Sequence, residues 1–66
     1  MLKFLTIDCP RCDILEDKLK AKNIQFERID DRTWFVEQGI NEFPLLELES
    51  GERLRYFDAV KYINNL

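Results

Sequence analysis

The opening segment of the chain carries apolar residues on both of its faces. In an extended strand, Leu2 and Phe4 would point to one side. Leu5 and Ile7 would point to the other side. A strand that is apolar on both faces is typical of a sheet covered by helices on its two sides. The pattern therefore predicts a central strand of an α/β domain over residues 2–7.

The spacing then becomes helical. Cys12, Leu15 and Leu19 recur at steps of three and four residues, which predicts a helix with one apolar stripe. Pro10 fits the first helical position, because the N–H that it lacks would have no partner there. Asn23 fits a left-handed residue that ends the helix.

The rest of the chain predicts a second strand, a short helix, a hairpin and a last helix. These are a strand over residues 24–29, a helix over residues 32–38 capped by Asp30-Asp31, strands over residues 45–49 and 53–57 joined by a two-residue turn at Ser50-Gly51, and a helix whose N-cap is Asp58. The first two strands, joined across a helix, should be parallel. We therefore expect one α/β domain over residues 1–66, with the order β-α-β-α-β-β-α and a four-stranded mixed sheet flanked by helices.

Composition narrows the possible chemistry. The 66 residues include no histidine and two cysteines. Catalysis by Ser-His or Cys-His pairs is thereby excluded, and two cysteines are too few for a closed all-cysteine zinc site within one chain. A net charge of −3 gives no general attraction for nucleic acid or for an anionic membrane. The first residues lack a long apolar run and a small-residue cleavage site, so we expect a protein of the reducing cytosol.

The motif Cys9-Pro10-Arg11-Cys12 lies where the first strand gives way to the helix. Cysteines three residues apart on a helical turn have Cβ atoms about 5–6 Å apart, so a disulfide needs little movement. As the N-cap, Cys9 would hold its sulfur near the free N–H groups of the first turn. These groups and the helix dipole favour the thiolate, which is the attacking species in disulfide exchange. Cys12, one turn into the helix, would be shielded.

Charges beside the motif act in opposite directions. Arg11 would stabilise a thiolate, although a cation in the first turn opposes the helix dipole. Asp8 and Asp13 would raise the pKa of a neighbouring thiol. The sequence leaves the sign of the net shift open.

With this motif, the chain resembles the glutaredoxin branch of the thioredoxin superfamily, including the short glutaredoxin-like hydrogen donors of ribonucleotide reductase. Cys-Pro-x-Cys resembles the glutaredoxin active site, and Phe43-Pro44 before the hairpin matches the family pattern. The resemblance implies a minimal thioredoxin-like fold with a cis Pro44 beside the sulfurs. It also implies that the backbone of Phe43 pairs with an extended substrate chain, as in β-augmentation.

The family pattern is not followed everywhere. Arg11 stands where glutaredoxins commonly have Tyr, and Glu42-Phe43 stands where they have Thr-Val or a similar pair. At the last helix, Asp58 resembles the residues that hold glutathione, whereas Tyr56-Phe57 resembles donors that depend on thioredoxin reductase. The resemblance therefore implies either glutathione or NADPH with thioredoxin reductase as the external electron source.

These observations predict a dithiol oxidoreductase. Cys9 would attack a disulfide in a protein such as ribonucleotide reductase, or a glutathione mixed disulfide, and Cys12 would resolve the intermediate. Pro10, Arg11 and Pro44 would support the site. We expect a monomer without a bound cofactor or metal, whose partners are its disulfide substrate and a reductase.

Two alternatives remain open at this point. In the first, the chain is a non-catalytic binding module of thioredoxin fold, and Asp8 and Asp13 leave Cys9 inert. In the second, Cys9 and Cys12 of two chains hold a bridging metal or iron–sulfur site.

Overall fold

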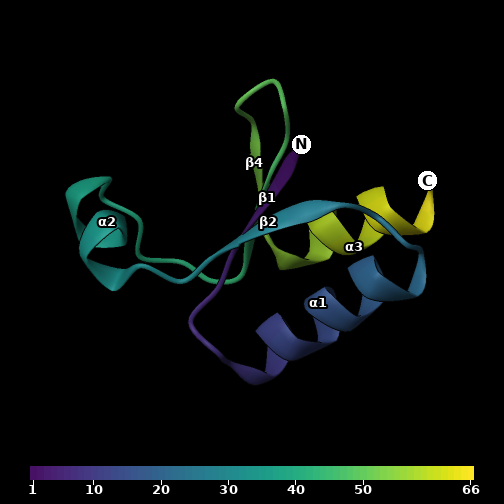
Figure 1. The fold of residues 1–66 in the computed structure, drawn as a ribbon, viewed down its shortest axis with the longest axis horizontal. Coiled ribbons are helices and arrows are strands. Elements are labelled where there is room, and N and C mark those ends of the chain that lie inside the picture. The colour runs from purple at the N-terminus through teal and green to yellow at the C-terminus, as the bar shows by residue number, and fades with distance from the viewer.

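The structure, a computed structural model, describes all of residues 1–66. Its elements are β1 (Leu2–Leu5), α1 (Pro10–Ala21), β2 (Phe26–Ile29), α2 (Arg32–Glu37), β3 (Leu45–Glu47), β4 (Arg53–Leu54) and α3 (Tyr56–Asn64) (Figure 1). The predicted order β-α-β-α-β-β-α is confirmed.

The four strands form one mixed sheet in the order β2-β1-β3-β4. β1 pairs in parallel with β2, as the intervening helix α1 requires. β3 pairs antiparallel with both β1 and β4. β1 and β3 are therefore the interior strands, and the segment after β1 starts from the middle of the sheet.

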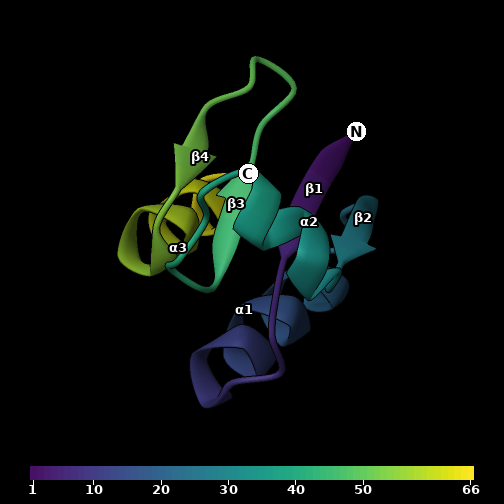
Figure 2. The same ribbon diagram turned by 90° about the vertical axis from the view of Figure 1, so that its left-hand side faces the viewer.

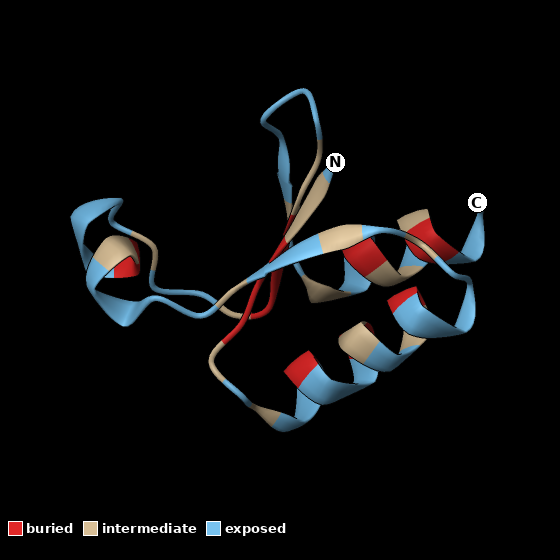
Figure 3. Ribbon diagram, viewed as in Figure 1, coloured by how far each residue is buried: buried red, intermediate tan, exposed pale blue.

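At its C-terminal end, β1 is buried on both faces, as its apolar pattern predicts. Phe4 belongs to the larger core cluster, together with residues of α1 and α3. Leu5 belongs to a smaller cluster with Phe35 of α2 and Leu45 of β3. Figure 3 shows the buried segments converging on β1 and on the inner sides of α1 and α3. The sheet therefore separates two cores, of which the second depends on one short helix.

Helix α1 has the features that its sequence predicts. Pro10 is its first residue, and Cys12, Leu15 and Leu19 are its buried residues. Asn23 follows with φ +55°, so it is the left-handed stop. α1 and α3 contact each other beside the sheet, whereas α2 is set apart from both (Figures 1 and 2).

The strands are shorter than predicted, and the expected two-residue turn at Ser50-Gly51 is wrong. Leu48 N–H donates to the Glu52 carbonyl at 2.8 Å, and Gly51 N–H donates to the Leu48 carbonyl at 2.9 Å. The loop therefore has three residues, 49–51. Gly51 supplies the positive φ, +94°, that a three-residue hairpin loop needs at its last position.

The predicted role of Asp58 as the N-cap of the last helix is also wrong. The N-cap of α3 is Arg55, whose side chain makes no capping hydrogen bond, and Asp58 lies in the first turn. The earlier start places Ala59 and Ile63 in the core, and the Asp58 carboxylate remains near the positive end of the helix dipole. Burial of the apolar stripe thus decides this boundary.

None of the helices has the length and apolar character needed to cross a bilayer.

Candidate functional site

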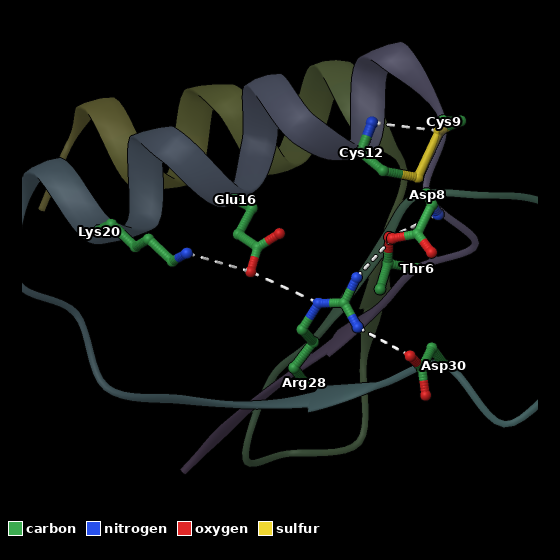
Figure 4. A network of polar contacts seen from close by, with 8 residues as sticks. All are labelled: Thr6, Asp8, Cys9, Cys12, Glu16, Lys20, Arg28 and Asp30. Atoms are coloured by element: carbon green, nitrogen blue, oxygen red, sulfur yellow. Dashed lines mark hydrogen bonds and ion pairs between the residues drawn. A yellow bond between two sulfur atoms is a disulfide. The ribbon is translucent and has the colours of Figure 1, made fainter.

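The two cysteines of the motif form a disulfide. Cys9 is the N-cap of α1 in an extended conformation, and Cys12 lies in the first turn. Their Cα atoms are 4.9 Å apart, within the usual range for a bridge. The bond that the spacing predicts is therefore present (Figure 4).

The two sulfur atoms have different surroundings. Cys12 is only 1% exposed and belongs to the larger core cluster. Cys9 is partly exposed, and its Sγ accepts a hydrogen bond from Cys12 N–H at 3.1 Å (Figure 4). The sequence predicted that free N–H groups of the first turn lie near this sulfur, and Cys12 supplies the one that donates to it. Cys9 is thus the residue that an external molecule can reach, and the helix N-terminus supplies a donor to it.

Phe43 and Pro44 lie at a groove next to the motif. The peptide bond between them is cis, as the resemblance implies. A groove of about 380 Å³ is lined by Arg11 of the motif, by residues 41–44 and by Arg55, Tyr56 and Phe57 at the start of α3. The structure therefore brings together three predicted site residues, Arg11, Phe43 and Pro44, on the wall of one groove.

Arg11 contacts aromatic rings. Its guanidinium carbon lies 5.1 Å from the centroid of Tyr56 and 5.2 Å from that of Phe57, a cation–π geometry. The sequence predicted Arg11 only as a support for the thiolate. In the structure it also joins the start of α1 to the start of α3, and leaves Phe57 66% exposed at the groove.

Asp58, which the resemblance placed in substrate binding, is exposed in the first turn of α3 and does not line the groove. The structure therefore does not join it to Phe43, the other predicted substrate-binding residue.

The carboxylates that flank the motif differ in one respect. Asp8 Oδ1 lies 2.5 Å from Nη2 of Arg28, on β2, whereas Asp13 has no ion pair. Sequence reasoning missed Arg28, because it is 20 residues from Asp8. The only route to it would have been the parallel register, which places Arg28 opposite Phe4.

The chain matches no family model, no curated protein and no solved structure. No group of three or more His, Cys, Asp or Glu residues gathers in the chain as a metal site would need.

Proposed function

We propose that this protein is a thiol–disulfide oxidoreductase whose reactive groups are Cys9 and Cys12. One observation carries the proposal. The two cysteines lie within disulfide distance at a helix N-terminus, one partly exposed and the other 1% exposed. This asymmetry gives each sulfur a separate task, attack for Cys9 and resolution for Cys12.

The reaction balances with the dithiol alone. The Cys9 thiolate attacks one sulfur of a substrate disulfide, forms a mixed disulfide and releases the other sulfur as a thiolate. The Cys12 sulfur, after losing its proton, then attacks Cys9 Sγ and releases the second substrate thiolate. The substrate gains two electrons and the protein is left with the Cys9–Cys12 disulfide. An external dithiol or two thiol molecules must then reduce this bond.

The thiolate of reduced Cys9 needs stabilisation without a histidine, because the chain has none. The N-terminal position on α1 provides it, since the free N–H groups and the helix dipole favour negative charge there. The hydrogen bond from Cys12 N–H already points at this sulfur in the oxidised protein.

The groove beside Phe43–Pro44 fits an extended substrate segment. Phe43 is partly exposed and Pro44 is buried, and both line the groove. We propose that the substrate is a protein disulfide, such as that of a ribonucleotide reductase, or a glutathione mixed disulfide. The backbone of Phe43 would hydrogen-bond to the extended chain while its disulfide meets Cys9.

A disulfide-reduction assay tests the proposal. The wild-type protein should turn over a disulfide substrate, Cys9→Ser should have no activity, and Cys12→Ser should accumulate a mixed disulfide on Cys9. Turnover by Cys9→Ser at the wild-type rate would contradict the assignment. A Cys9 thiol with a pKa at or above about 8.5, together with no turnover, would instead favour the binding module. Colour or metal in protein purified without oxygen would favour the bridging metal site.

The electron donor is the second question for the same assay. Because Asp58 lies outside the groove and exposed Phe57 lies in it, we propose NADPH with thioredoxin reductase as the donor system. Turnover should then require this system and should not occur with glutathione and its reductase. Asp58→Asn should leave the rate unchanged, whereas Phe57→Ala should slow reduction by the reductase. A rate supported by glutathione that falls in Asp58→Asn would contradict this choice.

A further inference from the structure

Arg28 on β2 lies at the centre of a cluster of carboxylates. Its Nη2 is 2.5 Å from Asp8, its Nη1 is 2.8 Å from Asp30, and its Nε is 3.4 Å from Glu16. Lys20 also pairs with Glu16, at 3.4 Å. Figure 4 shows the guanidinium between these groups, with the Cys9–Cys12 bond beyond Asp8. Each side of the guanidinium fork is therefore held by a different segment of the chain.

Asp8 connects this cluster to the cysteines. It directly precedes Cys9, so the two Cα atoms are only about 3.8 Å apart, and it has φ +62°. Its N–H donates to Oγ1 of Thr6 at 3.3 Å, and Thr6 is 1% exposed. Thr6 itself continues the pairing with β2, because its N–H donates to the Ile29 carbonyl at 3.0 Å. The residue before Cys9 is thus fixed at its backbone by Thr6 and at its carboxylate by Arg28.

The other charges around the motif do not compensate Asp8. Arg11 lies over the rings of Tyr56 and Phe57. Arg55 and Glu42, which line the groove, pair with each other at 2.8 Å. The remaining charged residue next to the motif is Asp13, on α1, which has the same sign as Asp8. Arg28 is therefore the cation that offsets the carboxylate nearest to Cys9 in the chain.

Arg28 keeps its charge wherever a thiol titrates. The hydrogen bond to Asp30 is the largest cause that raises the pKa of its guanidinium above the ordinary value, and burial, the next largest effect, opposes it. The hydrogen bond to Asp8 and the charges of Glu16 and Asp8 raise the pKa further. The compensation of Asp8 is therefore independent of pH across the range in which Cys9 gains and loses its proton.

We propose that Arg28 is a positioning residue of the redox site: by pairing with Asp8, it prevents that carboxylate from suppressing the Cys9 thiolate. A like charge beside a thiol favours the protonated form, and pairing that charge removes the effect. The role of Arg28 depends on the proposed function in one respect only, which is the link between the Cys9 thiolate and turnover. Loss of the pair should raise the Cys9 pKa by about half a unit to one unit, which is a three- to tenfold smaller thiolate fraction below the midpoint.

The test measures the rate of Cys9 alkylation by iodoacetamide against pH, in reduced protein that carries Cys12→Ser so that one thiol reacts. Arg28→Gln should move the midpoint upward and slow alkylation at neutral pH by about three- to tenfold. Arg28→Lys keeps the charge and should stay within about twofold of the parent. Arg53→Gln is the matched control, because Arg53 pairs with Glu47 at 2.8 Å within the hairpin, and it should leave the midpoint unchanged.

A double substitution separates charge from structure. If Arg28 acts through Asp8, then Asp8→Asn in the Arg28→Gln background should return the midpoint to near the parent value, because neither charge remains. An unchanged midpoint in Arg28→Gln, or a double variant as slow as Arg28→Gln alone, would overturn the proposal. Alkylation does not require turnover. A result that overturns the role of Arg28 can therefore be distinguished from one that overturns the proposed function. An inactive enzyme with the predicted alkylation profile would refute the oxidoreductase and leave the role of Arg28 standing.

Discussion

Replacing Phe35 with alanine tests how the second face of the sheet is covered. Phe35 is 2% exposed and is the single buried residue of α2. It packs with Leu5 and Leu45, and its ring centroid lies 4.7 Å from that of Phe43. The substitution therefore removes most of the smaller core and one support of the segment that leads into Pro44.

The expected loss of stability follows from these contacts. Truncation of a buried phenylalanine to alanine costs about 3–5 kcal/mol, and the lost ring pair with Phe43 is part of this sum. A domain of 66 residues is stable by about 3–10 kcal/mol in total. Phe35→Ala should thus remove about a third or more of the total stability, whereas Phe35→Leu, which keeps apolar volume, should cost about 1–2 kcal/mol.

Urea unfolding followed by circular dichroism and by the fluorescence of Trp34, the single tryptophan, measures these free energies. Val36→Ala is the control on the same helix, because Val36 is 79% exposed and should change the stability by less than about 0.5 kcal/mol. If Phe35→Ala were as stable as Val36→Ala, the smaller core would not depend on α2, and the account of the sheet as a layer between two cores would be wrong.

Three further substitutions test individual features of the fold and the site. Asp31→Ala removes the side chain that accepts from Trp34 N–H at 3.1 Å, and should lower the free energy of unfolding by about 1 kcal/mol; an unchanged urea midpoint would show that the cap is dispensable. Gly51→Ala meets no atom within 4 Å, but φ is +94°, so the backbone alone should cost about 1–2 kcal/mol, and a neutral result would contradict the three-residue loop. Arg11→Ala removes the contacts to Tyr56 and Phe57; it should cost about 0.5–1 kcal/mol of stability in urea, and an effect near zero would mean that the stacked geometry does not persist in solution.

The order of the elements could be predicted from the sequence, because the hydrophobic periodicity and the helix stop signals indicate the same elements. Leu15 and Leu19 define the buried stripe of α1, and Pro10 and Asn23 mark its two ends, where the structure also has them. Phe4 and Leu5 point to opposite faces of the strand, and this alternation predicted a sheet covered on both sides, as the structure has it. These features are local, so they can be seen without knowledge of the packing.

The boundaries near the hairpin could not be obtained in the same way. Ser50-Gly51 is compatible with a two-residue or a three-residue loop, and the register between β3 and β4 decides which one forms. Asp58 is a good capping residue by type, but burial of Ala59 and Ile63 starts α3 earlier, at Tyr56. In both places, contacts distant in the sequence decide between local alternatives of similar free energy.

The candidate site, too, could be predicted from the sequence only in part. The disulfide between Cys9 and Cys12 follows from their spacing alone. The partner of Asp8 does not, since it depends on a parallel pairing that brings Arg28 alongside β1. The sign of the charge effect on the thiol therefore depends on the fold, whereas the thiol pair can be identified from the motif alone.

In the proposed reaction, Cys9 is the attacking thiol and Cys12 is the shielded one. The most direct measurement is to alkylate the reduced protein at neutral pH with less than one equivalent of iodoacetamide and to map the modified peptide by mass spectrometry. The label should lie on Cys9, because this residue is partly exposed at the helix N-terminus and Cys12 is 1% exposed. A label that lies mainly on Cys12, or is shared equally by both cysteines, would contradict this assignment.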